Sequence, residues 1–370
     1  MKILVIGSGA REHAILRSLE KEHSHNLYAW GGNPGIWEIA DDISDGISVS
    51  DHKAISNKIN ELAIELVVVG PEDPLAEGIV DDLLELCPSI EIFGPTKAAA
   101  VLEASKSFAK DVMRAAKIPT SKSDTCSTIE EVKDALNKRE SDNNPYVVKA
   151  DGLAAGKGVV VTESIDEAIE HAENCFKTKD SKVVIEDYLD GPEFSQFFIC
   201  DGKTALPLLP AQDFKRIFDG DKGANTGGMG SYVPLKWLPE GSSEWCRENI
   251  ANPLLREMQS RNTPFVGVLF VGLAYTSKGI RVIEFNVRFG DPETQVVLEK
   301  MQSKLSDIFY RAAKGNRGCG QLQEGEKLKW DNNSYCNVVL ASAGYPESSH
   351  KGDVITGLKQ VIAKGGVILE

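Results

Sequence analysis

Strongly apolar runs alternate with amphipathic stretches over the first hundred residues, and this alternation constrains the fold more than any other feature. KILVIGSGAREHAILRSLEK (residues 2–21) predicts a buried strand, a glycine turn and an amphipathic helix. Further strands are expected at LYAW (27–30), ELVVVG (65–70) and IEIFG (90–94). Such alternation favours an α/β fold with a parallel, doubly wound sheet, whose ligand loops lie at the carboxyl ends of its strands.

The first glycine turn, GSGARE, matches only part of the dinucleotide-binding fingerprint. Gly7 and Gly9 are the first two glycines, but Glu12 stands where the third is required. No acidic residue ends the second strand near Trp30 to hold a ribose hydroxyl. A nicotinamide dehydrogenase is therefore disfavoured.

A strong helix is predicted over 97–118, and after it the apolar runs of the sequence become shorter. Shorter strands follow (PYVVKA, GVVVT, SKVVIEDYL), with the helix SIDEAIEHAENCF between the second and third. This pattern predicts a second module built on antiparallel strands up to about residue 190. A third stretch runs from 191 to about 320, and a short β-rich tail begins near 326.

VVKADGLAAGKGVVV (147–161) places glycines and lysines between two β-branched runs. It is not a P-loop, because Gly152 and Gly156 are one residue too close and Gly158 replaces the serine or threonine that would ligate magnesium. The flanking runs predict a hairpin. Such a hairpin can fold its amides over a polyphosphate, with Lys149 and Lys157 supplying charge. An ordinary solvated hairpin is the alternative.

IEFNVRFGDPETQ (283–295) is the densest polar cluster in the chain. If it forms a strand, Glu284, Asn286 and Arg288 lie on one face and the apolar residues on the other. A carboxylate, an amide oxygen and a guanidinium together suit magnesium bridged to phosphates. The alternative is an exposed strand face with a local Glu284–Arg288 ion pair.

Three further segments carry candidate residues with weaker patterns. DFKRIFDGDKGANTGGMGSY (213–232) is a long polar stretch of the kind that forms active-site loops. IEDYLDGPEF (185–194) fits an adenosine-binding hinge or a simple hairpin. Lys106 lies in a predicted helix, where a lone lysine normally faces solvent.

Composition excludes several classes of protein. The formal net charge of −14 argues against a nucleic-acid partner. The longest apolar run, FVGVLFVGLAY (265–275), is shorter than the ~20 residues of a membrane span, and the N-terminus is not that of a signal peptide. Seven cysteines without a C-x-x-C motif fit reduced thiols and a cytoplasmic location. The oligomeric state is left open, with a monomer favoured.

Taken in order, VIGSGAREHA, VGPEDPL, FGPT, LEASKSFAKD, VVKADGLAAGKGV, ANTGGMGSY and IEFNVRFGDPETQ resemble the ATP-grasp superfamily and, within it, the phosphoribosylamine–glycine ligase family of purine biosynthesis. The resemblance covers essentially the whole chain. It implies an N-terminal doubly wound substrate-binding domain (1–102), an ATP-grasp module of two lobes (103–190 and 191–325) and a partial C-terminal β-rich domain (326–370). The glycine hairpin would then be a flap over the phosphates of ATP.

Residue roles follow from the same resemblance, position by position. ATP would contact Lys106, Lys149, Gly152, Gly156, Lys157, Gly158, Glu186, Leu189 and Glu193. The metal, Mg²⁺ or Mn²⁺, would be held by Glu284 and Asn286, and the catalytic residues would be Asp213, Lys215 and Arg288. Substrate would contact Gly9, Arg11, Pro71, Glu72, Asp73, Asn225, Thr226, Gly227, Gly228, Gly290, Asp291 and Glu293.

The implied reaction joins glycine to 5-phosphoribosylamine through a glycyl phosphate, with ATP converted to ADP and phosphate. Many ATP-grasp enzymes carry a second acidic metal ligand on the preceding strand, but FVGLAY has no acid there, so a two-metal site built wholly from protein ligands is not expected. Two alternatives to the glycine ligase remain open, another ATP-grasp carboxylate–amine ligase of purine synthesis and a non-catalytic ATP-binding module.

Overall fold

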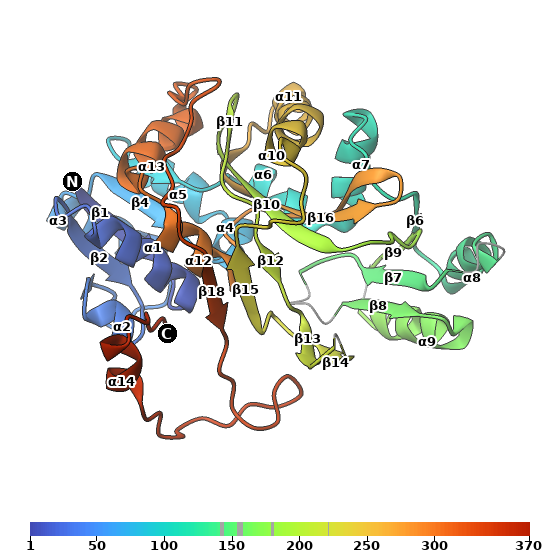
Figure 1. Cartoon of the computed structure of the whole chain (residues 1–370). Coiled ribbons are helices and arrows are strands. Elements are labelled where there is room, and N and C mark those ends of the chain that lie inside the picture. Colours follow the sequence, from blue (N-terminus) through green and yellow to red (C-terminus); the bar gives the residue numbers. More distant parts are fainter. Residues whose placement is uncertain (141–143, 154–157, 179–180, 221) are drawn as a thin grey trace.

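The N-terminal part forms a five-stranded parallel sheet in the order β3-β2-β1-β4-β5, as predicted (Figure 1). The structure is a computed structural model, and it describes residues 1–140, 144–153, 158–178, 181–220 and 222–370. The strands are β1 (Lys2–Ile6), β2 (Asn26–Trp30), β3 (Asp41–Asp42), β4 (Leu66–Val69) and β5 (Glu91–Phe93). The helices are α1 (Ala10–Glu20), α2 (Pro34–Trp37), α3 (His52–Leu62), α4 (Glu72–Glu77) and α5 (Ile79–Leu86).

Both faces of this sheet are buried, which explains its nearly continuous apolar strands. Leu4 and Ile6 belong to one hydrophobic cluster, while Ile3 and Val5 belong to another on the opposite face. The strand order reverses direction between β1 and β4, because the chain first builds outward to β3 and then returns to β4. This is the switch point at which ligands bind in open α/β sheets.

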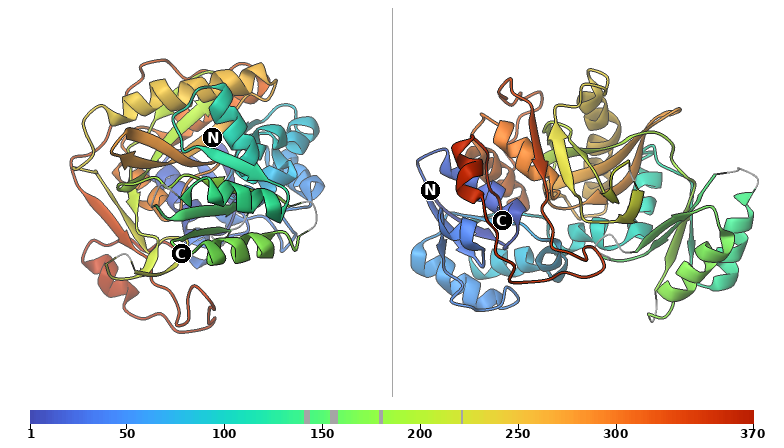
Figure 2. Two further views of the ribbon diagram at one scale, coloured as in Figure 1. Left: turned by 90° about the vertical axis from the view of Figure 1, so that its right-hand side faces the viewer. Right: turned by 60° about the horizontal axis from the view of Figure 1, so that its bottom comes forward.

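The next module is an antiparallel sheet in the order β6-β9-β7-β8, at the end of the molecule opposite the parallel sheet (Figure 2). Its strands are β6 (Ser123–Cys126), β7 (Tyr146–Ala150), β8 (Val159–Thr162) and β9 (Val183–Glu186), covered by α8 (Ile129–Asn137) and α9 (Ile165–Cys175). Lys149 of β7 pairs with Val159 of β8, which confirms the predicted glycine hairpin. This module has its own hydrophobic cluster.

A second antiparallel sheet, β11-β10-β16-β17, lies between these two parts (Figures 1 and 2). Its strands are β10 (Glu193–Asp201), β11 (Ala205–Pro207), β16 (Val266–Thr276) and β17 (Gly279–Asn286). The helices with it are α10 (Ser242–Cys246), α11 (Asn252–Ser260), α12 (Glu293–Lys300) and α13 (Leu305–Ala313). It shares its core with the parallel sheet, and Phe93 stacks on Phe309 with 4.3 Å between the ring centroids.

The polar stretch 213–232 was expected to be a loop, and the structure corrects this. It contains β12 (Gln212–Asp213), β13 (Arg216–Phe218), β14 (Lys222–Asn225) and β15 (Gly230–Val233). Strands β13 and β14 pair as a short hairpin, while β15 pairs with both β12 and β18 (Tyr335–Val338). The many glycines of this stretch suggested an irregular loop, but each of its short strands is hydrogen-bonded to a neighbouring strand.

The remainder of the described chain adds one helix in the C-terminal segment, α14 (Leu358–Ala363), none of whose residues is buried. β18 is the strand that this segment contributes to the sheets of the described residues. Among those residues, no helix combines the length and the apolar composition needed to cross a membrane. All seven cysteines are free.

The helix expected over 97–118 is two helices, α6 (Lys97–Ala104) and α7 (Lys106–Ala115). Ser105 between them is extended, with φ −138° and ψ 113°, and its hydroxyl accepts a hydrogen bond from the amide of Phe108. Serine is a favoured N-cap because its oxygen satisfies an amide that the helix leaves free. The break makes Lys106 the first residue of a helix.

Candidate active site

Glu284 and Asn286 lie at the end of β17 and share a face of the strand, as predicted. The predicted strand was too long, because β17 ends at Asn286 and Arg288 lies beyond it in a bend. Phe285, Val287 and Phe289 are buried on the other side. Among the described residues, neither Glu284 nor Asn286 has a side-chain hydrogen bond, so their oxygens are available as acceptors.

Positive charge surrounds Glu284 from several elements. Burial by itself raises the pKa of Glu284, but the charges of Lys149, Lys215, Lys106 and Arg288 outweigh it and hold the pKa below its usual value. These cations come from β7, the segment after β12, the start of α7 and the bend after β17. The site therefore keeps its carboxylate ionised at neutral pH.

The glycine hairpin is attached to the first turn of α7. Lys106 Nζ donates to the carbonyl of Gly152 at 2.9 Å, and the hydroxyl of Ser107 donates to Asp151 Oδ2 at 2.5 Å. The amide of Ser107 also donates to Asp151 Oδ1. The alternative interpretation of Lys106, a lone helical lysine that faces solvent, does not hold, because Lys106 at the start of α7 contacts the hairpin. Gly156 and Lys157 lie outside the described residues.

Gly152 and Gly158 mark the described ends of the hairpin turn. Gly152 has φ +140°, a region that residues with a Cβ rarely adopt, so glycine is required there. The carbonyl of Gly158 accepts a hydrogen bond from the amide of Ala150 at 2.7 Å. Backbone geometry thus accounts for the glycine at position 152.

Glu186, at the end of β9, is almost completely enclosed. Its Oε2 accepts from Lys110 Nζ at 2.9 Å and from the hydroxyl of Ser121 at 2.7 Å, and its Oε1 lies 3.2 Å from Lys149 Nζ. Burial raises the pKa of Glu186, but Lys149 and Lys110 outweigh it and the pKa is lowered. Leu189 follows in a half-buried connection to β10.

Glu193 begins β10 with an exposed carboxylate. Lys215 Nζ lies 3.0 Å from Glu193 and 3.9 Å from Asp213. Burial lowers the pKa of Lys215, but Asp213, Glu193 and Glu284 outweigh it and the pKa is raised. Burial raises the pKa of Asp213, and Lys215 offsets only part of that effect. Lys215 therefore pairs with Glu193, the predicted ribose ligand, and lies near Asp213, a predicted catalytic residue.

Arg288 pairs with two carboxylates from the N-terminal part. Its Nε lies 3.1 Å from Glu72 Oε2 and its Nη2 lies 3.1 Å from Glu103 Oε1. Glu103, from α6, also accepts the amide of Val287 at 2.7 Å. The local Glu284–Arg288 ion pair considered for an exposed strand is not formed. Arg288 instead connects the end of β17 to helices α4 and α6.

Arg11 reaches the same place from the first turn of α1. Its Nη1 donates to the carbonyl of Phe289 at 3.2 Å and lies 3.7 Å from Glu72 Oε2. The buried Glu12 holds it, with 2.6 Å between Arg11 Nε and Glu12 Oε1. Glu12 also accepts the amide of Gly9 at 2.8 Å. Two guanidinium groups thus converge on Glu72.

Glycines at the ends of β1 and β4 make room for Glu12. A Cβ at Gly7 or at Gly70 would overlap the Glu12 side chain. Pro71 is the N-cap of α4, followed by Glu72 and the exposed Asp73 in its first turn. The Gly9–Arg11 turn and the Pro71–Asp73 turn therefore meet at the switch point between β1 and β4.

The loop Asn225–Gly228 and the segment Gly290–Glu293 pack together. The amide of Thr226 donates to the carbonyl of Lys215 at 2.7 Å, and a Cβ at Gly228 would overlap Pro292. Gln295 Nε2 donates to Asp291 Oδ1 at 2.7 Å. The C-terminal segment contributes Tyr345, whose hydroxyl accepts from the amide of Gly227 at 3.0 Å.

Glu293 is 2% exposed at the start of α12 and accepts from the hydroxyl of Ser195 at 2.7 Å. Burial and the nearby charge of Asp213 raise its pKa to about 7. Close packing explains Gly290, since a Cβ there would lie 2.5 Å from Glu293 Oε2. Glu293 is therefore a predicted site residue whose pKa lies near neutral pH.

The sequence patterns missed four residues that hold this site together, Glu12, Glu103, Lys110 and Asn337. Asn337 Oδ1 accepts from the amide of Ser231 and its Nδ2 donates to the carbonyl of Pro292, which connects β15 and the segment before α12 to β18. Lys110 could have been found, because it follows Lys106 by one helical turn. Glu103 and Asn337 act across 184 and 45 residues of sequence, and no local pattern signals that.

Comparison with known proteins identifies the family. The model of the phosphoribosylglycinamide synthetase N domain matches residues 1–103, and the model of the phosphoribosylglycinamide synthetase ATP-grasp (A) domain matches residues 104–294. The chain belongs to the phosphoribosylamine–glycine ligase family. The resemblance noted from the sequence is thereby confirmed.

Individual relatives agree with this family. The phosphoribosylamine–glycine ligase of Streptomyces coelicolor is 48% identical over 365 residues, 98% of this chain and 84% of that protein. The crystal structure of the Thermotoga maritima phosphoribosylamine–glycine ligase has 30% identity and a TM-score of 0.77, covering 95% of this chain and 83% of that one. A biotin carboxylase domain from Hydrogenobacter thermophilus, solved with MgADP, shares the fold at 17% identity and a TM-score of 0.66, covering 90% and 73%.

Phosphoribosylamine–glycine ligases are ATP-grasp enzymes that use ATP with Mg²⁺ or Mn²⁺, and the donor set at the end of β17 fits such a cation. Glu284 and Asn286 would offer the hard oxygen donors that magnesium prefers. Gly272 lies opposite Glu284 on the neighbouring strand β16. No residue of β16 is acidic, so this strand provides no second carboxylate ligand. The described residues contain no cluster of three or more His, Cys, Asp and Glu able to hold a metal.

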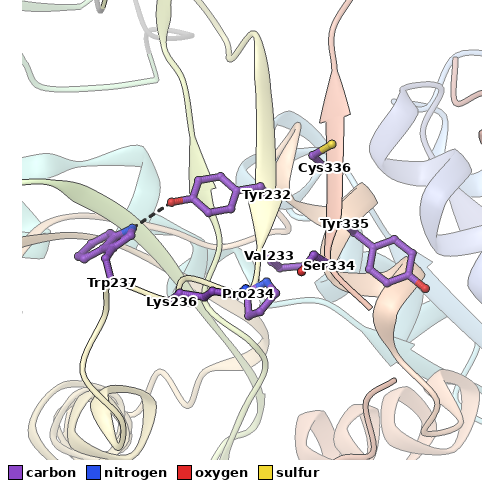
Figure 3. A pocket seen from close by; sticks show the side chains of 8 residues that line it. All are labelled: Tyr232, Val233, Pro234, Lys236, Trp237, Ser334, Tyr335 and Cys336. Atoms are coloured by element: carbon purple, nitrogen blue, oxygen red, sulfur yellow. Dashed lines mark hydrogen bonds between the residues drawn. The ribbon is translucent and has the colours of Figure 1, made fainter. Parts of the chain in front are cut away.

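One pocket lies beside β15 and has Lys236 as the charged residue in its lining (Figure 3). It encloses ≈ 440 Å³ between β15 and the start of β18, and Tyr232, Trp237 and Tyr335 contribute aromatic walls. Trp237 Nε1 donates to the hydroxyl of Tyr232 at 3.0 Å (Figure 3). None of the predicted site residues lines this pocket.

Proposed function

We propose that the protein ligates glycine to 5-phosphoribosylamine and forms glycinamide ribonucleotide, ADP and phosphate in purine (IMP) biosynthesis. The observation that carries this proposal is the ionised Glu284 beside Asn286, surrounded by Lys106, Lys149 and Lys215. Such a set can hold a metal–polyphosphate complex between the two antiparallel sheets. Family membership supplies the substrates.

For ATP, we propose that Lys106 and Lys149 contact the phosphates and that Glu186 and Leu189 contact the adenine. Glu193, at the exposed start of β10, would hold the ribose. The hairpin residues Gly152, Gly156, Lys157 and Gly158 would cover the phosphates. The attachment of Gly152 to Lys106 supports this arrangement, because it places a phosphate-binding lysine at the base of the hairpin.

For the other substrates, we propose two neighbouring groups. The sugar phosphate would lie at the β1–β4 switch point, bound by Gly9, Arg11, Pro71, Glu72 and Asp73. Glycine and the reacting phosphoryl group would lie between Asp213, Lys215 and Arg288. The residues of two neighbouring loops would also contact substrate there: Asn225, Thr226, Gly227, Gly228, Gly290, Asp291 and Glu293. The contacts of Arg11 and Arg288 with Glu72 support a common site.

The chemistry requires activation of a carboxylate. Glycine oxygen attacks the γ-phosphorus of ATP and releases ADP, and the amine of phosphoribosylamine then displaces phosphate from the acyl carbon. Lys106, Lys149, Lys215 and Arg288 would orient the phosphates and offset the negative charge of the transferring group. Orientation alone can remove ~7–11 kcal/mol of barrier. The metal, when bound at Glu284 and Asn286, supplies further charge neutralisation.

The division into domains at 1–102, 103–190, 191–325 and 326–370 is part of this proposal, as are a cytoplasmic location and a monomeric state. The separate hydrophobic cluster within 126–185 supports the second of these units. The seven free cysteines are consistent with a reducing compartment.

Omission of substrates one at a time tests the function. ADP should form only when ATP, magnesium, glycine and phosphoribosylamine are all present, as measured with a coupled assay of ADP release. Equal ADP formation with another amine acceptor in place of phosphoribosylamine would exclude the proposed reaction and favour a different carboxylate–amine ligase. Binding of ATP without any turnover would favour a non-catalytic module.

A further inference from the structure

Lys110 is a buried lysine in α7 that no predicted role uses. Its side chain is 4% exposed, and its ammonium group donates to Thr120 Oγ1, Ser121 Oγ and Glu186 Oε2, each at 2.9 Å. An ammonium group has three protons to donate, so all of them are engaged. Lys110 is therefore fixed in place by its surroundings.

Glu186 divides its two oxygens between two lysines. Oε2 is held by Lys110 and Ser121, whereas Oε1 faces Lys149 alone, at 3.2 Å. Lys149 has one further contact among the described residues, a 3.3 Å hydrogen bond to the carbonyl of Ile283. Lys149 is thus held by fewer and longer contacts than Lys110.

The charges of this cluster do not act on Glu186 alone. Two ammonium groups contact the single carboxylate of Glu186, and the charge of one of them, Lys149, also acts on Glu284. A buried carboxylate without a counter-ion is strongly unfavourable. If Lys149 turns from Glu186 to a phosphate, the pair formed by Lys110 and Glu186 remains neutral. If Lys110 were absent, the same movement would leave Glu186 unpaired.

We propose that Lys110 is a positioning residue, the permanent counter-ion of Glu186 that leaves Lys149 available to the phosphates of the nucleotide. This inference rests on the proposed contact of Lys149 with ATP. Lys110 itself touches no substrate in this arrangement. Its effect on ATP is exerted through Glu186 and Lys149.

A purely structural lysine would have a different effect. Losing it would weaken the binding of every nucleotide ligand that the first lobe holds, including adenosine. If Lys110 is a positioning lysine, its loss leaves Glu186 held in place by Lys149 and makes Lys149 less available, so ligands that carry phosphates should be weakened far more than adenosine. The dissociation constants of ATP and adenosine therefore separate the two roles.

The test is a double-mutant cycle with Lys110→Met, Lys149→Met and the double variant, measured as dissociation constants for ATP and for adenosine. Lys110→Met should raise the ATP constant at least about tenfold, because Glu186 then retains Lys149, and should change the adenosine constant less than about threefold. The double variant should bind ATP no more weakly than Lys149→Met, since coupled residues are not additive. Additive losses would overturn the inference.

Three controls make the result decisive. Lys110→Arg keeps the charge and should restore ATP affinity, and Lys110→Gln serves as the neutral variant if the methionine variant does not fold. Lys300→Met removes another buried lysine, which pairs with Asp331 at 3.2 Å, and should leave ATP affinity unchanged. If Lys149→Met leaves ATP binding unchanged, the proposed phosphate contact is wrong. If Lys149→Met weakens ATP and Lys110→Met does not, only the inference on Lys110 is wrong.

Discussion

Two regions of this molecule each place one carboxylate between two cations, but they differ in how much solvent reaches them. In the nucleotide region, Glu186 lies between Lys110 and Lys149, and all three side chains are between 4% and 6% exposed. At the β1–β4 switch point, Glu72 lies between Arg11 and Arg288 with its side chain 30% exposed. The first cluster is closed and the second is open.

This difference indicates two ways to prepare charge for a ligand. In the closed cluster, the carboxylate is fixed and an adjacent lysine is left with loose contacts. In the open cluster, each arginine has a permanent partner, Glu12 for Arg11 and Glu103 for Arg288, while Glu72 is shared between them. An anionic ligand that displaces Glu72 would find both guanidinium groups already oriented, which reduces the entropy lost on binding.

Matched charge removals test the comparison most strongly. Glu186→Gln should lower the free energy of unfolding by about 3–5 kcal/mol, because it leaves two buried lysines without a carboxylate. Glu72→Gln should lower it by only about 0–1 kcal/mol, because solvent screens the open cluster. Chemical denaturation of the two variants and the parent protein measures both changes. Equal losses in the two variants would contradict the distinction between closed and open clusters.

Glu293 sharpens the comparison, because it is as buried as Glu186 but is hydrogen-bonded to a hydroxyl rather than paired with lysines. Burial, followed by the charge of Asp213, raises the pKa of Glu293 to about 7 from its usual 4.5. The folded state then binds more protons than the unfolded state between these two values, so stability falls as pH rises through this window.

The parent protein should therefore lose roughly 2–3 kcal/mol of unfolding free energy relative to Glu293→Gln between about pH 5 and about pH 8. Denaturation of both proteins across this range measures the difference. Gln is the suitable variant because it keeps the volume and a hydrogen-bond acceptor for Ser195. A constant difference between the two proteins would show that Glu293 does not titrate in this range.

Glu284 is an intermediate case, because the charges of several lysines act on it but it forms no direct ion pair among the described residues. Glu284→Gln should reduce turnover at saturating magnesium by at least about a hundredfold, or ~2.7 kcal/mol, since a neutral amide is a much weaker magnesium ligand than the carboxylate that it replaces. The melting temperature of the ligand-free protein should also fall, because the lowered pKa of Glu284 means that its charge stabilises the fold at neutral pH.

Asn286→Ala is the matched variant for this site and should reduce turnover less, because it removes a neutral ligand. Steady-state turnover and thermal melting, each with and without magnesium, distinguish the metal site from a structural charge. Near-normal turnover of Glu284→Gln would exclude Glu284 as a metal ligand.

The sequence predicted the elements whose patterns are local. The parallel sheet follows from continuous apolar strands, the glycine hairpin from its β-branched flanks, and the shared face of Glu284 and Asn286 from strand periodicity. It failed where distant residues decide. The helix break at Ser105 coincides with a contact to Asp151, 46 residues away. The end of β17 at Asn286 coincides with the hydrogen bond and the ion pair that Glu103 makes with Val287 and Arg288.

Tyr345→Phe has the smallest expected effect. It tests whether the C-terminal segment supports the Asn225–Gly228 loop, which is proposed to bind substrate. The hydroxyl of Tyr345 accepts a hydrogen bond from the amide of Gly227 at an exposed position, so its loss should cost about 0.5–1.5 kcal/mol at most. We expect the KM for one of the non-nucleotide substrates to rise about two- to tenfold, with the KM for ATP unchanged and the melting temperature only slightly lowered. Tyr310→Phe is the control, because its hydroxyl makes no hydrogen bond among the described residues and it lies in α13. A rise in the KM for ATP, or an equal change in both variants, would show that Tyr345 does not act through the Asn225–Gly228 loop.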